Sequence, residues 1–302
     1  MNATLQVAQL KQTLGSRAPH VAQLEAIAAD IRRTTIAAIY HATSGHPGGS
    51  LSCSDILAVL YGTVLNLPTA EHPDIDRDRF VLSKGHAAPA LYATWAAYGL
   101  MPRAEALTLR KLGSRAQGHP HVLDCPLAES STGSLGQGFS VAIGIAMGLR
   151  LQARAPRVYA LLGDGELQEG EVWEGAMCAA HYGLANLCAI IDYNKLQSDD
   201  RNAAIMGLEP LAQKWRAFGW NTLEINGHDI PGILAAFDTA KAEKNAPTMI
   251  IAHTTKGKGV GYMEDQAPWH GSVKLTPEQT REALVALGTE PAQIESLING
   301  RG

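Results

Sequence analysis

The chain has 302 residues, of which 46% are hydrophobic and 18% are charged, and this composition is typical of a folded globular protein rather than a largely disordered one. Its formal net charge of -4 gives no bulk attraction to nucleic acid or to anionic membranes, so we expect neither as a partner. The length suits one large α/β domain.

Apolar periodicity along the chain predicts alternating helices and strands. A first helix is expected over 21–43, with Gly45 as its left-handed cap, and Ser54 and Asp55 begin the next helical run, over 56–65. Further helices are predicted near 87–98, 102–112, 136–154 and 277–287. Short strands are predicted at 80–82, 158–162, 187–192, 221–225 and 248–253.

This order predicts an α/β fold with a parallel sheet and helices on both of its faces, because parallel neighbours need crossover connections. We expect an N-terminal extension over 1–20, one domain over 21–275, and a C-terminal helix and tail over 276–302. The glycine-rich segment 256–261 is interpreted as a flexible loop within the domain rather than a boundary.

Cysteine spacing and the absence of apolar segments indicate a location. No two cysteines form a C-x-x-C pair, which predicts reduced thiols rather than a zinc site or a disulfide framework. Residues 1–20 contain no apolar core of the signal-peptide kind, and no stretch has the apolar length of a membrane span. The sequence therefore predicts a cytoplasmic protein. The cysteines are Cys53, Cys125, Cys178 and Cys188.

The strongest chemical signal follows two neighbouring predicted strands. Asp164 lies between Gly163 and Gly165 directly after the strand at 158–162, and Asn194 follows the strand at 187–192. The carboxyl ends of strands in open α/β sheets line the ligand crevice, so a carboxylate and an amide oxygen meet there and suit a hard cation such as Mg²⁺. The glycines let backbone approach a diphosphate closely.

A lone Gly-Asp-Gly is usually only a turn. It is not the dinucleotide-binding fingerprint either, because no third glycine follows at the required spacing and Gly170 comes too late. Combined with an acidic residue at 166 and an asparagine about thirty residues after Asp164, the pattern resembles the signature of thiamine diphosphate enzymes.

Further segments narrow the resemblance to the transketolase family. They are Ser-Gly-His-Pro-Gly-Gly at 44–49, Ser-Lys-Gly-His-Ala at 83–87, Gly-His-Pro at 118–120, Thr-Gly-Ser-Leu-Gly-Gln-Gly at 132–138 and Trp-His-Gly at 269–271. The resemblance covers roughly residues 25–275. The thiamine-dependent pyruvate dehydrogenases share the Gly-Asp-Gly element but are not expected to carry the first of these loops, and they remain the closest rival.

The resemblance implies a role for individual residues. Asp164, Asn194 and the backbone carbonyl of Leu196 are expected to bind Mg²⁺, and His46 and His270 to act as acid-base groups toward a sugar. Contacts with thiamine diphosphate are expected from His86, His119, Gly133, Ser134, Leu135, Gly163, Gly165, Glu166, Asn194, Leu196 and His270. Three other histidines, His20, His72 and His228, are expected to be structural.

The resemblance further implies transfer of a two-carbon ketol unit to an aldose from a ketose, which we expect to be phosphorylated. Only about thirty residues follow His270, too few for a second α/β domain, so the pyrimidine-binding half is expected in a C-terminal transketolase subunit. Ser134 stands where full-length members usually have proline, and this replacement resembles split, two-chain transketolases. We expect an A2B2 heterotetramer.

Two alternative functions remain open: a subunit of a thiamine diphosphate enzyme acting on 2-oxo acids, and a non-catalytic transketolase-like modulator.

Overall fold

The structure is a computed structural model that describes residues 21–67 and 76–300. The predicted extension over 1–20 therefore lies outside the described residues, as do His20 and His72.

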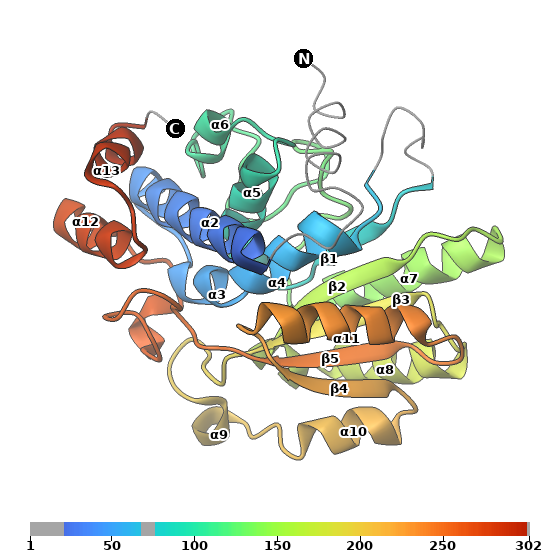
Figure 1. The fold of residues 1–302 in the computed structure, drawn as a ribbon. Coiled ribbons are helices and arrows are strands. Elements are labelled where there is room, and N and C mark those ends of the chain that lie inside the picture. Colours follow the sequence, from blue (N-terminus) through green and yellow to red (C-terminus); the bar gives the residue numbers. More distant parts are fainter. Residues whose placement is uncertain (1–20, 68–75, 301–302) are drawn as a thin grey trace.

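A five-stranded sheet forms the centre of the molecule (Figure 1). All neighbouring strands are parallel, and their spatial order is β1-β2-β3-β5-β4. The strands are β1 (Arg79–Leu82), β2 (Val158–Gly163), β3 (Leu187–Tyr193), β4 (Asn221–Asn226) and β5 (Thr248–His253). The predicted fold class is confirmed, and each predicted strand is found within one or two residues of its expected ends.

Helices cover both faces of this sheet because successive strand residues point to opposite sides. In β2, Tyr159 and Leu161 belong to one buried cluster, whereas Ala160 and Leu162 belong to another. The first cluster includes α2 (Val21–Ala42), α4 (Ser54–Val59), α5 (Ala88–Ala97) and α11 (Ile230–Ala242). The second includes α7 (Gln137–Leu151), α8 (Gly170–His181) and α10 (Leu211–Ala217).

Shorter elements connect these layers. They are α3 (Pro47–Ser52), the π-helix η1 (Leu60–Val64), the 3-10 turns η3 (Gly85–Ala87), η4 (Gly165–Gln168) and η5 (Ala267–Trp269), and the one-turn helices α6 (Arg103–Ala106) and α9 (Asn202–Ile205). The helix predicted over 102–112 is thus reduced to α6 followed by turns. The predicted C-terminal helix is α12 (Pro277–Ala286), and the expected tail contains a further helix, α13 (Pro291–Ile298), packed like α12 against α2.

One local prediction near α2 is wrong. The residue with left-handed backbone after α2 is Thr43, with φ of 53°, and not Gly45. Gly45 is instead required for close approach, because a Cβ there would lie 2.6 Å from Ile39 Cγ1. Its carbonyl accepts a hydrogen bond from the Val273 amide, which brings the loop at 44–49 beside the loop that carries His270. The prediction that Ser54 and Asp55 begin a helical run is confirmed, since α4 begins at Ser54, and Asp55 in its first turn also forms a buried ion pair with Arg32.

The glycine-rich segment 256–261 also differs from its prediction. It is a loop, but Lys256 and Val260 are buried, with 1% and 0% of their surface exposed. The Gly257 amide donates to the Gly48 carbonyl, so the segment packs against α3. Lys256 thereby enters the interior, where a long cationic side chain requires specific partners.

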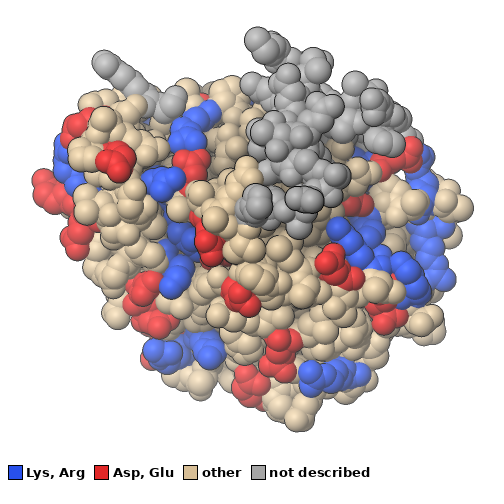
Figure 2. All heavy atoms as spheres, in the orientation of Figure 1, with Lys and Arg blue, Asp and Glu red and all other residues tan. Residues whose placement is uncertain are grey.

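The surface carries both signs of charge. Figure 2 shows basic and acidic side chains interspersed over one face of the molecule. Within the part of the chain that the structure describes, no helix has the length and apolar character needed to cross a membrane. The four cysteines are free thiols, and all except Cys178 are buried.

Replacing Gly45 by alanine should destabilise the chain, because the new methyl group overlaps Ile39 in a closely packed interior. We expect a loss of about 1–3 kcal/mol in the free energy of unfolding, measured by chemical denaturation. Gly144→Ala is the matched control, since a methyl group there would have no atom within 4 Å and alanine favours helix. Equal stability of the two variants would contradict the close approach at Gly45.

Candidate functional site

A cavity of about 340 Å³ lies at the carboxyl edge of the sheet, where the loops after β1, β2 and β3 meet α3 and the 256–270 region. All of the sequence-predicted site residues line it except Ser134, which is exposed beside it. The predicted residues found there are His46, His86, His119, Gly133, Leu135, Gly163, Asp164, Gly165, Glu166, Asn194, Leu196 and His270. The sheet thus brings together residues separated by more than two hundred positions.

A buried ion pair supports the floor of this cavity. Lys84, directly after β1, places Nζ 2.5 Å from Asp192 Oδ2 and 2.7 Å from the Gly49 carbonyl oxygen. Burial by itself raises the pKa of Asp192, but Lys84 and hydroxyl donors outweigh it, so the pKa of this carboxyl is below its usual value. The sequence analysis missed both residues, although Lys84 stands inside the quoted motif at 83–87.

Three residues that could offer oxygen ligands to a metal line the cavity at the ends of β2 and β3: Asp164, Asn194 and Leu196, whose carbonyl accepts from Lys256 Nζ. The Asp164 carboxylate accepts the Gly165 amide and the Lys195 amide. Burial and the nearby Asp192 raise the pKa of Asp164 to about 6, which means that the charged carboxylate lacks full compensation. A bound cation would supply that compensation.

This oxygen set fits Mg²⁺ by its chemistry. Magnesium prefers hard oxygen ligands and completes its octahedron with phosphate oxygens and water. Among residues 21–67 and 76–300, no three or more His, Cys, Asp or Glu side chains form a cluster able to hold a metal ion. The predicted site draws on one carboxylate, one amide and one backbone carbonyl, so its remaining ligands would come from a diphosphate and water.

Glu166 is buried and makes its contacts within the chain. One carboxylate oxygen accepts from the Ser83 hydroxyl and the Gly136 amide, and the other accepts from the Gly163 amide at 2.9 Å. These bonds join the ends of β1 and β2 to the loop before α7. Such contacts fit a residue that holds the 133–136 backbone, and its assignment to cofactor binding stays a prediction.

Four histidines also line the cavity. The ring centroid of His46 lies 5.4 Å from that of His86, 6.4 Å from that of His119 and 6.2 Å from that of His270. Burial, followed by nearby cations, lowers the pKa of His46 to about 4 and of His270 to about 3, and it also lowers the pKa of the other two. These imidazoles are therefore neutral near pH 7.

Neutral imidazoles can accept or donate a hydrogen bond at each ring nitrogen according to tautomer. His46 Nδ1 is buried without a hydrogen-bond partner among the described residues, which suits a site completed by a ligand. The backbone of Gly133 packs closely against the His119 ring, since a Cβ on Gly133 would lie 3.2 Å from His119 Cδ2. His228 lies outside the cavity and makes two hydrogen bonds, as expected for a structural histidine.

Lys256 is the second cation of the cavity, and the sequence analysis missed it. Its Nζ donates to the Leu196 carbonyl at 2.6 Å and contacts His270 Nδ1. Burial lowers the pKa of Lys256 to about 8. A lysine at the start of the Lys-Gly-Lys-Gly run at 256–259 was the available signal, but such a segment also suits a solvated loop, and only packing distinguishes the two.

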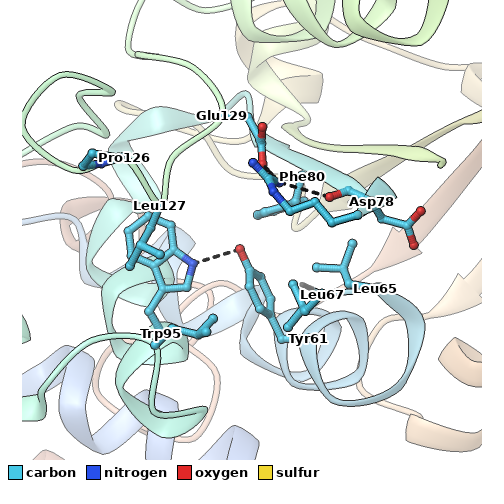
Figure 3. A pocket seen from close by; sticks show the side chains of 11 residues that line it. Tyr61, Leu65, Leu67, Asp78, Phe80, Trp95, Pro126, Leu127 and Glu129 are labelled. Atoms are coloured by element: carbon cyan, nitrogen blue, oxygen red, sulfur yellow. Dashed lines mark hydrogen bonds and ion pairs between the residues drawn. The ribbon is translucent and has the colours of Figure 1, made fainter. Parts of the chain in front are cut away.

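A second cavity, of about 140 Å³, lies between η1, β1 and α5 (Figure 3). Among the residues that line it, Trp95 Nε1 donates to the Tyr61 hydroxyl at 2.9 Å, and Arg77 and Glu129 form an ion pair. Its lining contains none of the motif residues, so the first cavity is the candidate site.

Comparison with known proteins agrees with this geometry. Residues 23–297 match the family described as transketolase, thiamine diphosphate binding domain. The chain is 40% identical over 270 residues to one subunit of the apulose-4-phosphate transketolase of Phocaeicola vulgatus, covering 89% of this chain and 95% of that protein. It is 40% identical over 262 residues to a 6-deoxy-6-sulfo-D-fructose transketolase subunit of a Clostridium species, covering 87% of this chain and 95% of that protein.

Solved transketolases share the fold over less than half of their own length. The Campylobacter jejuni enzyme aligns with a TM-score of 0.80 at 31% identity, covering 92% of this chain and 46% of the other. A Pichia stipitis transketolase solved with xylulose 5-phosphate aligns with a TM-score of 0.83 at 29% identity, covering 92% and 44%.

Fold and cavity together define the diphosphate-binding domain of a thiamine diphosphate enzyme. Among such enzymes, the chain belongs to the transketolase family and corresponds to the family's N-terminal, thiamine diphosphate-binding half. The resemblance inferred from the sequence motifs is thereby confirmed. The roles of individual residues remain proposals.

The low pKa of His46 can be measured directly. In the cofactor-free chain, the ring protons of His46 should titrate near pH 4 in an NMR pH series, whereas an unperturbed histidine titrates near 6.5. Because the folded pKa is lowered, the stability linked to this group is present above pH 6.5 and declines as the pH falls toward 4. Assignment follows from the signal lost in His46→Gln, and a midpoint near 6.5 would contradict the burial argument.

Proposed function

We propose that this chain is the diphosphate-binding subunit of a two-chain transketolase, which moves a two-carbon ketol unit from a ketose donor to an aldose acceptor. The observation that carries the proposal is the convergence, in one cavity, of an oxygen-donor set at Asp164 and Asn194 with four neutral imidazoles. The first half of this arrangement suits a magnesium diphosphate, and the second suits a polyhydroxylated substrate.

Different residues of the cavity would hold different parts of the cofactor. Asp164, Asn194 and the Leu196 carbonyl would bind Mg²⁺, and Lys256 lies beside them with a charge that a diphosphate would neutralise. Leu135 and Leu196 would contact the thiazolium ring of the cofactor. When bound, thiamine diphosphate supplies the carbanion stabilisation that cleavage and formation of a carbon-carbon bond require.

Histidines supply the hydrogen-bonding and proton-transfer groups of this chain. His46 and His270 line the cavity, and because burial lowers the pKa of each ring, both are unprotonated near neutral pH and can offer a ring nitrogen to a sugar hydroxyl. His86 and His119 adjoin His46 and would orient the same ligand through hydrogen bonds. The low pKa values favour return of an accepted proton, which suits groups that act in both directions of a transfer.

A partner chain would complete the site. The two split relatives are subunits by name, and this chain covers 95% of each. We therefore propose that a C-terminal transketolase subunit supplies the pyrimidine-binding half, and that two copies of each chain form an A2B2 heterotetramer. Four free thiols suit a reducing compartment, which supports a cytoplasmic location.

The substrate class is a ketose with an anionic end. One relative is named for apulose 4-phosphate and the other for 6-deoxy-6-sulfo-D-fructose, so the anion of the donor differs between two relatives of equal identity to this chain. The histidines of the cavity would meet the carbon atoms and hydroxyls that such donors share. Protein groups that contact the phosphate or sulfonate end of the ketose would determine which donor is used.

Removing the central carboxylate tests the cofactor assignment. Asp164→Asn keeps the shape of the side chain but removes its charge, and we expect Mg²⁺-dependent affinity for thiamine diphosphate to fall roughly 10- to 100-fold in calorimetry of the assembled enzyme. Asp199→Ala is the control, because Asp199 is exposed on the loop after β3. Unchanged affinity of the Asp164 variant would contradict the proposed metal ligand.

Ketol transfer should require a second polypeptide. We expect the purified chain with Mg²⁺ and thiamine diphosphate to show no transfer from xylulose 5-phosphate, apulose 4-phosphate or 6-deoxy-6-sulfo-D-fructose, and to gain it with a C-terminal transketolase subunit. The physical reason is that a cavity formed by one domain leaves the other half of the cofactor in water.

Three results of that assay are informative. Robust transfer by the chain alone, with mass spectrometry excluding a co-purified partner, would contradict the two-chain proposal. Turnover of pyruvate in place of ketoses would favour an enzyme of 2-oxo acids. Cofactor binding by the mixed chains without turnover of any donor would favour a modulator.

A further inference from the structure

The loop that carries Lys256 into the cavity is held by a histidine outside it. His228 lies between β4 and α11, and its Nε2 accepts the Thr255 amide at 2.8 Å. A backbone amide can only donate, so this ring nitrogen must be unprotonated. The proton of the neutral ring is therefore on Nδ1, which donates to Asp55 Oδ2 at 2.7 Å.

The chain of contacts continues into the helical layer. Asp55 on α4 accepts from two guanidinium nitrogens of Arg32 on α2, and Arg32 Nε donates to the Leu51 carbonyl at 3.1 Å. Both charged residues are nine-tenths buried or more, at 8% exposed for Arg32 and 6% for Asp55. A buried, bidentate pair of this kind fixes the carboxylate in one place, and hence fixes the imidazole that it holds.

Three other hydrogen bonds hold the residues on either side of Thr255. Thr254 donates its amide to the Tyr193 carbonyl and its hydroxyl to Asp192, and the Gly257 amide donates to the Gly48 carbonyl. Thr255 lies between them, and its amide donates to His228. The next residue is Lys256, whose side chain enters the cavity and reaches the Leu196 carbonyl.

We infer that His228, oriented by Asp55 and Arg32, is a positioning residue that sets where Lys256 enters the cofactor cavity. This inference rests on the proposed function for its consequence, because Lys256 is expected to meet the diphosphate. It assigns His228 no contact with cofactor or substrate. From the sequence His228 is expected only to be structural, whereas its ring holds the backbone directly before Lys256.

Three substitutions separate the two hydrogen bonds of His228. His228→Gln can still present an oxygen to the Thr255 amide, His228→Asn can reach Asp55 but is too short for Thr255, and His228→Ala makes neither bond. His253→Gln is the matched control. His253 immediately precedes the segment that begins at Thr254 and also contacts a carboxylate, Glu224 at 3.3 Å, but this contact is exposed to solvent. Thermal unfolding shows which variants fold.

Hydrogen exchange of the Thr255 amide in the full, cofactor-free chain is the first measurement. Loss of one buried hydrogen bond should speed exchange about tenfold in the alanine and asparagine variants, with the glutamine variant and the control close to wild type. The second measurement is the affinity for thiamine diphosphate of the complex with the partner subunit. This affinity should weaken about five- to tenfold in the alanine and asparagine variants and stay close to wild type in the glutamine variant and the control.

The outcomes distinguish this inference from the proposed function. Wild-type exchange in both the alanine and asparagine variants would overturn it. Faster exchange with unchanged cofactor affinity would show that the loop is held but Lys256 is not positioned, which also overturns it. If wild-type complex binds no thiamine diphosphate, the proposed function fails, and the cofactor half of the inference with it. If the alanine variant does not fold, the asparagine and glutamine variants decide the question.

Discussion

A single buried carboxylate at the end of β3 organises the candidate site. Asp192 is fully buried and accepts hydrogen bonds from Ser52 on α3, Lys84 after β1 and Thr254 after β5. Those donors come from three separate parts of the chain, so the carboxylate fixes their loops relative to one another. Burying this charge is tolerated only because it is paired and fully hydrogen-bonded, and removal of any donor would leave part of that charge uncompensated.

The same packing explains the electrostatics of the cavity. Lys84 and Lys256 are both buried near the histidines, and their charges add to the effect of burial in disfavouring protonated imidazole. The cavity therefore holds two buried cations, neutral rings and an incompletely compensated Asp164 carboxylate. A magnesium diphosphate carries both signs of charge, and this distribution complements it.

The sequence predicted the regular and local features most successfully. All five strands and the Gly-Asp-Gly turn were placed because a buried parallel strand is a short apolar run, and its carboxyl end is marked by polar residues. Features that depend on contact between distant segments were not predicted. The ion pair of Asp55 with Arg32 and the hydrogen bond from the Thr255 amide to His228, which holds the segment interpreted as flexible, are examples.

The sequence by itself determined the family, the fold class and most of the residues that line the cavity, because those are carried by short motifs in a characteristic order and by apolar patterns that depend only on neighbours in the chain. Tertiary structure alone decided which charges are buried, which histidines are neutral and which partners hold Lys84, Asp192 and Lys256. The physical reason is that hydrogen bonding and desolvation depend on what lies within a few ångströms in space, and residues from 48 to 270 meet at this one sheet edge.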